Sequence, residues 1–239
     1  MFHAEMGQYD EAEKAYQAAL RIEVQVRDRS GEAHTLGQLG NLYAGKGRLE
    51  EAVRFNQQAA TVYRELSDLA NESRTCNNLA DILLRLGRHD EARREILRGI
   101  ECKEPFGHAV QPWTTFAILA NLERAAGNMA AASAARQRAV DAYLAYRRDG
   151  GENLSGSARI FGLVAQAIAG NQVPAAEARL SQLQGRTDLP ARLKALLPKL
   201  QAILRGARDP SLAADPDLDY DDAAELELLL EHLARGRQA

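Results

Sequence analysis

The sequence predicts an all-α fold, a right-handed superhelical solenoid of helix-turn-helix repeats with a C-terminal helical cap. The first observation is the motif GRLEEA at residues 47–52, which recurs at intervals of 40 residues from Gly7, from Gly87 and, in an eroded form, from Gly127. A fixed period of this length is typical of stacked repeats. The second is that apolar residues follow helical rather than alternating spacing. The third is an alanine-rich composition with only 5% aromatic residues, which favours close-packed helices over sheets.

Composition and charge restrict the classes of partner. With 30 basic and 33 acidic residues the net charge is -3, so electrostatics favours neither nucleic acid nor a membrane as a partner. The two cysteines, Cys76 and Cys102, make no disulfide framework. No apolar run approaches the roughly 18 to 20 residues of a spanning helix, and the N-terminus does not resemble a signal peptide. We therefore expect a cytoplasmic protein.

The N-terminal stretch is predicted to be the second helix of an incomplete repeat. Apolar residues from Tyr9 to about Asp28 have helical spacing, and only five residues separate Met1 from the turn expected at Gly7. We therefore expect the array to start in the middle of a repeat. The apolar face of this helix would then be available to pair two chains in a homodimer.

The next repeat is complete, with one helix over residues 31–44 and a longer one ending near Leu66. Gly47 is expected just past a helix end, where a residue without a β-carbon adopts the left-handed conformation at low cost. Small residues at facing positions, Gly40 and Ala52, are expected to let the two helices approach closely.

These positions resemble the tetratricopeptide repeat, whose consensus combines a Leu-Gly or Leu-Ala pair, an aromatic residue, the turn glycine and a later alanine. The matching residues are Leu39-Gly40, Tyr43, Gly47 and Ala52 in one repeat, Leu79-Ala80, Gly87 and Ala92 in the next, and Leu119-Ala120, Gly127 and Ala132 in the third. Leu83 and Glu123 replace the aromatic residue. The period resembles the long repeats of the LGN/Pins and kinesin light chain type. HEAT or armadillo repeats have a similar period but do not explain the Gly and Ala positions.

The C-terminal part departs from the repeat pattern. We expect a repeat array over residues 1–149, a degenerate repeat over 150–186 and capping helices over 187–239. Pro198 is expected to kink the first capping helix. A solvated acidic linker should follow, and Asp222 with Glu225 looks like a capping pair for the last helix.

The resemblance implies that the first helices line a concave groove that holds a protein or peptide segment. Asn41, Asp81 and Asn121 share one register position there, and an amide offers both a donor and an acceptor to a bound main chain. Asp81 would select a basic residue, and the arginines would meet acidic ones. An alternative is that these amides only bridge neighbouring helices. The full set of candidate groove residues is Gln38, Asn41, Arg74, Asn77, Asn78, Asp81, Arg85, Asn121 and Arg124.

Several other functions are less well supported. Gly37, Asn77 and Ala117 stand where the carboxylate-clamp subtype needs basic residues, so binding of a chaperone's acidic C-terminal tail is not expected. The histidines are scattered, no nucleotide-binding motif is present, and we expect no enzyme, cofactor or metal site. One alternative is the C-terminal sensor or regulatory region of a larger signalling protein such as a STAND ATPase, and a remote one is an uncharacterised hydrolase. A basic cluster is expected to be a solvated face: Arg88, Arg93, Arg94 and Arg98.

Overall fold

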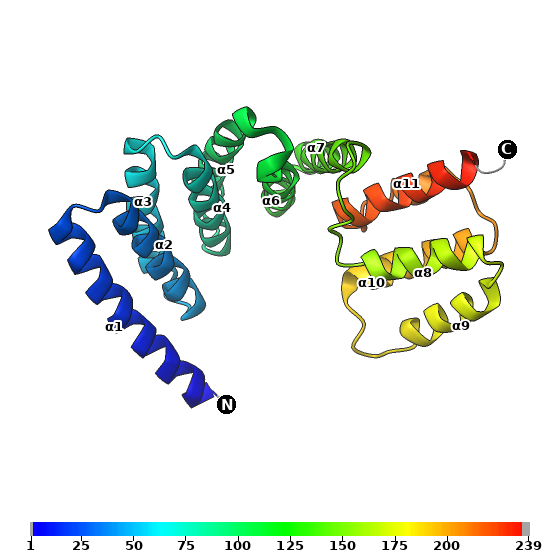
Figure 1. Ribbon diagram of the computed structural model, residues 1–239, viewed down its shortest axis with the longest axis horizontal. Coiled ribbons are helices and arrows are strands. Elements are labelled where there is room, and N and C mark those ends of the chain that lie inside the picture. Colours follow the sequence, from blue (N-terminus) through cyan, green and yellow to red (C-terminus); the bar gives the residue numbers. More distant parts are fainter. Residues whose placement is uncertain (1, 236–239) are drawn as a thin grey trace. The chain divides into compact units, whose positions relative to one another are not determined.

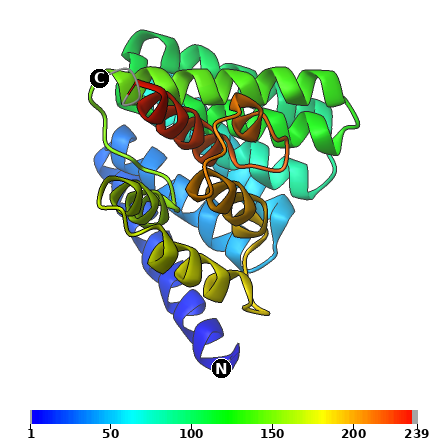
Figure 2. The ribbon, with the colours of Figure 1, turned by 90° about the vertical axis from the view of Figure 1, so that its right-hand side faces the viewer.

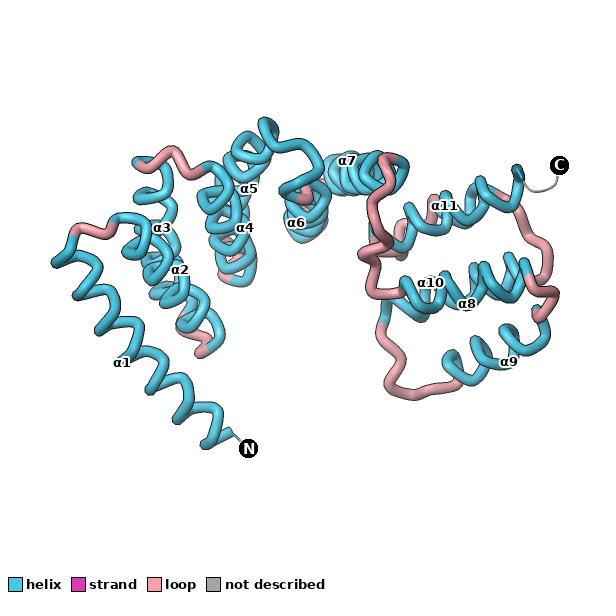
Figure 3. Tube along the Cα trace, in the orientation of Figure 1, coloured by secondary structure: helices cyan, strands magenta, loops and turns pink. Residues whose placement is uncertain are grey.

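The structure is a computed structural model that describes the backbone of residues 2–235 and the side chains of residues 9–235. Within this range it contains eleven α-helices, two short 3-10 helices and no strand (Figures 1 and 3). The prediction of an all-α fold of helix-turn-helix repeats is confirmed. The chain divides into two units, residues 1–135 and 136–239.

Successive helices of the first unit alternate between two rows (Figure 1). The helices α2, α4 and α6, which we call the first helices, form one row, and α3 and α5 lie in the other. The helices of this unit are α1 (Phe2–Val26), α2 (Arg29–Gly45), α3 (Leu49–Glu65), α4 (Leu69–Arg85), α5 (His89–Lys103), the 3-10 helix η1 (Glu104–Val110) and α6 (Pro112–Ala125). Helix α7 (Met129–Arg148) continues into the second unit.

The turn inside each repeat is built on glycine, as predicted. Gly47 has φ +74°, its N–H bonds to the Ala44 carbonyl at 3.2 Å, and the Arg48 N–H bonds to the Tyr43 carbonyl at 2.9 Å. This pair of bonds is the Schellman motif, which satisfies carbonyls left open at a helix end. Gly87 and Gly127 repeat it at φ +72° and +81°.

The turns between repeats use the same geometry without glycine. Arg27 and Ser67 have φ +60° and +56°, and the next residues, Asp28 and Asp68, cap the following helix. The Asp28 carboxylate accepts from the Gly31 N–H at 2.9 Å. The two aspartates lie 40 residues apart, so their spacing marks the repeat boundary as regularly as the glycines mark its middle. The sequence interpretation overlooked this signal.

The turn expected at Gly7 does not form. Helix α1 runs without interruption from Phe2 to Val26, so this copy of the motif lies inside a helix. A glycine inside a helix costs only about 1 kcal/mol relative to alanine. The motif therefore makes a turn only where helices on both sides of it pack together.

The small-residue positions are filled differently from the prediction. A β-carbon added to Gly40 would lie 2.1 Å from Nδ2 of Asn56, so the absent side chain makes room for a buried side chain of α3. Ala52 and Ala92 are fully buried in the same core. Tyr43 stacks on Phe55 with ring centroids 5.1 Å apart, and both rings belong to or pack against the same core.

The second unit contains a core of leucines on α10, among them Leu196, Leu197 and Leu200. Helix α10 runs through Pro198 as one element. The segment predicted to be a solvated linker is held in place: Arg136 Nη2 donates to the Asp215 carbonyl at 2.9 Å, and Lys199 pairs with the Asp215 carboxylate at 2.5 Å. The remaining helices, seen from the side in Figure 2, are α8 (Ala158–Ala169), α9 (Val173–Gln184), α10 (Ala191–Leu204), η2 (Pro210–Ala213) and α11 (Tyr220–Arg235).

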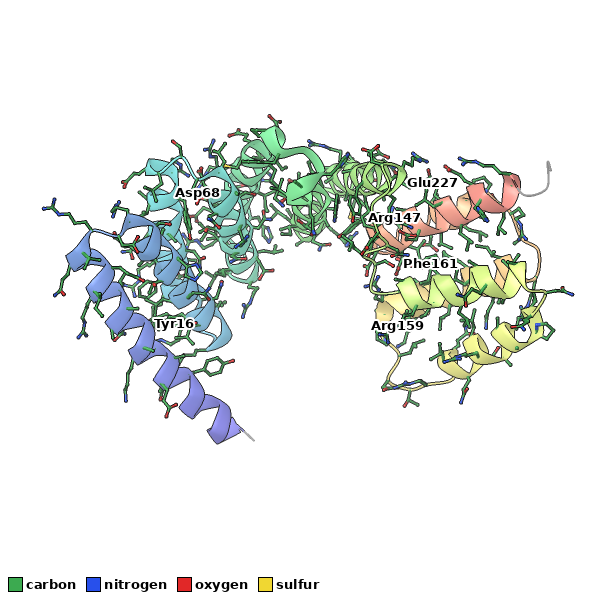
Figure 4. All side chains as sticks on the ribbon, viewed as in Figure 1. Tyr16, Asp68, Arg147, Arg159, Phe161 and Glu227 are labelled. Atoms are coloured by element: carbon green, nitrogen blue, oxygen red, sulfur yellow. The ribbon has the colours of Figure 1, made fainter. Side chains whose placement is uncertain are left out.

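The capping pair predicted for the last helix is wrong. Helix α11 begins at Tyr220, so Asp222 and Glu225 lie inside it and are buried. Glu225 accepts from Arg147 Nε at 2.6 Å and from the Tyr143 hydroxyl at 3.2 Å. Arg147 is labelled in Figure 4. Because the helix starts three residues earlier than a cap at Asp222 requires, both carboxylates turn toward neighbouring elements instead of its own N-terminus.

No helix among the described residues combines the length and the apolar character needed to cross a bilayer.

Candidate functional site

The exposed face of the first helices carries the predicted site residues. Asn41 on α2, Asp81 on α4 and Asn121 on α6 are all exposed at the same register position. Side chains from neighbouring first helices meet here: Asn78 Nδ2 donates to Asn41 Oδ1 at 3.2 Å. Asn77 Nδ2 donates to the Thr115 hydroxyl at 3.0 Å and joins α4 to α6.

The remaining candidates either contact neutral groups or are exposed side chains. Gln38 Nε2 lies 3.4 Å from a ring nitrogen of His34. Arg85 donates to the Ala44 carbonyl at 3.4 Å, and Arg124 donates to Asn121 Oδ1 at 3.2 Å. Arg74 and Asp81 are exposed. The structure thus brings Asn41 and Asn78 together and leaves Asp81 on its own.

The basic cluster near the third turn is largely neutralised, which corrects the expectation of a solvated face. Arg93 donates to both oxygens of Glu123, at 2.6 and 3.0 Å, and lowers the pKa of that buried carboxyl. Arg88 pairs with Glu91 at 2.6 Å. The Arg93–Glu123 pair stands where the previous repeat has Val53 and Leu83, so an ion pair replaces an apolar contact. The paired replacement of both positions was the signal in the sequence that could have revealed it.

A buried carboxylate connects three helices of the array. Glu72 on α4 is fully buried and accepts from Arg98 of α5 at 2.8 and 2.9 Å and from Arg64 of α3 at 2.9 Å. Burial acts to raise the pKa of Glu72, but the bonds from Arg98 and Arg64 outweigh it and lower the pKa. This carboxylate is structural, because its bonding capacity is used within the fold.

The cysteines are buried thiols without nucleophilic character. Both are free, and burial raises the pKa of Cys102 to about 11 and that of Cys76 further. A thiolate is the reactive form, so neither side chain is suited to attack a substrate near neutral pH.

An acidic cluster in the second unit already has a cation beside it. Asp219, Asp221 and Asp222 each offer an oxygen within 4.8 Å of the others. Arg192 lies 3.4, 3.3 and 3.0 Å from their carboxylates. We assign no metal to this cluster, because the guanidinium supplies the positive charge that it needs.

Comparison with known proteins supports the repeat assignment. A tetratricopeptide repeat model matches residues 1–65 and 31–104. Among solved structures, the chain is similar to BtubC (BKLC) from P. vanneervenii, with 19% identity and a TM-score of 0.59 over 85% of this chain and 77% of that one. A search of the curated proteins found no match.

At this low identity the structural likeness supports the fold alone. The family match covers the same residues in which the glycine turns and the paired helices α2 to α5 repeat every 40 residues. The resemblance inferred from the sequence is thereby confirmed. Residues 1–104 therefore resemble tetratricopeptide repeats.

Proposed function

We propose that the chain is a non-catalytic scaffold whose exposed first-helix face binds a segment of another protein. Tetratricopeptide repeats generally mediate protein–protein interaction and are typically non-catalytic. The observation that carries the proposal is the row of exposed polar side chains at one register position of α2, α4 and α6, formed by Asn41, Asp81 and Asn121.

The hydrogen bonds of these amides leave donors for a partner. Asn41 and Asn121 each use the side-chain carbonyl oxygen within the chain, accepting from Asn78 and Arg124. Their NH₂ groups are the donors that remain, and each suits a main-chain carbonyl of an extended segment. Asp81 adds a carboxylate that suits a basic group of the partner.

The same proposal places the chain in the cytoplasm and makes a protein segment the partner, with no cofactor. The net charge of -3 and the two free thiols support this choice over nucleic acid, a membrane surface or an oxidising compartment.

The double substitution Asn41→Ala plus Asn121→Ala tests the binding face. We expect the affinity for a partner captured from the native source to fall about tenfold or more, because each lost hydrogen bond contributes about 0.5–1.5 kcal/mol. Isothermal titration gives the affinity, and circular dichroism checks the fold. Gln57→Ala plus Gln58→Ala, exposed amides on α3, are the matched control. Unchanged affinity with an intact fold would show that the amides only bridge helices.

We further propose that the outer face of α1 pairs two chains. Ile22 and Val26 are 59% and 67% exposed, whereas Val62, at the register position of Ile22 in the next repeat, is only 5% exposed. Val62 belongs to a buried cluster, whereas no part of the chain that the structure describes buries Ile22 in the same way.

Sedimentation equilibrium at high micromolar concentration should therefore detect a dimer that Ile22→Glu weakens, because a charge in the interface would be buried. Val24→Glu is the control, since Val24 is also exposed but lies about 200° around the helix from Ile22. A strictly monomeric wild-type chain would rule out the pairing.

A further inference from the structure

The junction between α5 and α6 is the one place in the described repeats where a longer insertion replaces the short turn. Lys103, the last residue of α5, lies under η1 and is 8% exposed. Its ammonium donates to the Gln111 carbonyl and to the Thr114 hydroxyl, both at 3.2 Å. Neither acceptor carries a charge. The insertion therefore holds a buried cation without an anion.

This lack of a counter-charge is unusual within the unit. The buried carboxylates Glu72 and Glu123 each have arginine partners. Burial, together with the nearby positive charge of Arg74, lowers the pKa of Lys103 to about 8. A buried ammonium is costly unless an opposite charge compensates it. An anion beside Lys103 would therefore offset the cost of burying its ammonium.

Arg74 and Lys103 flank the same contact between two first helices. Arg74 on α4 and Thr114 on α6 occupy equivalent register positions, and Lys103 is bonded to Thr114. One turn further along α4, Asn77 is bonded to Thr115. Arg74 is exposed and its charge acts on Lys103, so an anion that reaches Arg74 from solvent would also come near Lys103.

The rest of the first-helix face has the same charge preference. Among the described residues of α2, α4 and α6, the carboxylates Glu32, Glu72 and Glu123 are held in ion pairs, and Asp81 is the exception. Within residues 9–235, whose side chains the structure describes, Arg74, Arg85 and Arg124 have no carboxylate within ion-pair distance. The face is therefore positive although the whole chain is negative.

We propose that Lys103 and Arg74 form a binding site for a carboxylate of an acidic protein segment that lies along the first helices. The choice of a protein segment rests on the proposed function, whereas the anion site itself does not. Carboxylates suit this face better than phosphates. Arg85 and Arg124, further along the first helices, are separate single positive charges, and each matches the single negative charge of one carboxylate. The site differs from a carboxylate clamp, since its buried cation comes from the end of a second helix, next to an insertion.

The test is an NMR titration of the lysine side chains in the full chain, with Lys103→Met identifying the Lys103 signal. Acetyl-Glu-Glu-Glu-amide is the probe and acetyl-Gln-Gln-Gln-amide the uncharged control. At saturation with the probe, we expect the pKa of Lys103 to rise by about one unit, which corresponds to about tenfold tighter binding to the protonated form. The glutamine peptide should leave it unchanged. A Lys103 pKa that does not respond to the glutamate probe would overturn the proposal.

Affinity measurements on variants complete the test. Arg74→Gln and Lys103→Met should each weaken binding of the glutamate probe about tenfold. Arg54→Gln, an exposed arginine on α3, should leave it within about twofold, as expected for a distant exposed charge. Arg74 is exposed, so its replacement should not affect folding, and methionine keeps the apolar stem of Lys103. Equal binding by all three variants would refute the site.

Two further outcomes separate the parts of the proposal. Tighter binding of a phosphoserine peptide than of the glutamate probe would overturn the choice of a carboxylate. If Asn41→Ala plus Asn121→Ala leaves partner binding intact while the probe still raises the Lys103 pKa, the proposed amide contacts are refuted and the anion site stands.

Discussion

Replacing Glu72 by alanine should lower the free energy of unfolding by about 3 kcal/mol. The carboxylate is fully buried between α3, α4 and α5, and its removal leaves Arg98 and Arg64 without their shared partner. The expected loss is at the lower end of the range for buried ion pairs. The side chains of Arg98 and Arg64 are 35% and 55% exposed, so water can hydrate them once the carboxylate is removed. Urea denaturation followed by circular dichroism measures the change.

Glu101→Ala is the matched control for this prediction. Glu101 also accepts from Arg98, at 3.2 Å, but its side chain is 63% exposed. An exposed pair at this spacing contributes about 0.5 kcal/mol or less. If both variants lost the same stability, the burial of Glu72 would not be the source of its effect.

Asp222→Asn should remove a pH dependence from the stability of the second unit. Asp222 is fully buried, its Oδ2 accepts from Arg192 and Ser157, and its Oδ1 has no hydrogen-bond donor. The pKa of Asp222 is raised from 3.8 to about 6, because burial and the charge of Asp221 outweigh Arg192 and Ser157, which act to lower it. Asp219 and Tyr220 also lie near this group.

The sign follows from the direction of this shift. The folded state binds the Asp222 proton more tightly than the unfolded state, so its contribution is fully present below about pH 4 and is lost as the pH rises through 6. The contribution is at most about 3 kcal/mol, since one pKa unit corresponds to about 1.4 kcal/mol. Asparagine carries no such charge, so between pH 4 and 7.5 the variant should gain stability relative to the wild type.

Denaturation at a series of pH values measures this difference. Asp219→Asn is the control, since Asp219 approaches the same arginine but its side chain is 52% exposed. Its difference from the wild type should stay nearly constant over the same range. A flat difference for Asp222→Asn would contradict the prediction.

Features that depend on neighbours along the chain could be predicted from the sequence. The turn at Gly47 needs a left-handed residue after a helix end, and the positions of its counterparts Gly87 and Gly127 show the period directly. The spans of the repeat helices could be predicted for the same reason, because the spacing of apolar residues indicates which face of a helix is buried. The exposed polar row of the first helices was also predictable, as it is one register position repeated every 40 residues.

Pairings between distant residues were not predictable in the same way. Asp222 and Glu225 have the spacing of a capping pair, yet both bond to other helices, because α11 starts earlier and turns them inward. The buried Lys103 gave no signal in composition or spacing.

The amino-acid order therefore established the repeat, its turns and the exposed polar row of the first helices, all of which are local or periodic. The folded chain alone shows which charges are already neutralised within it. Ion pairing depends on which side chains from separate helices come within about 4 Å, and many arrangements of the same residues satisfy one helical pattern. For this protein that difference separates the paired Arg93 and Arg98 from Arg74 and Lys103, which lack a carboxylate partner.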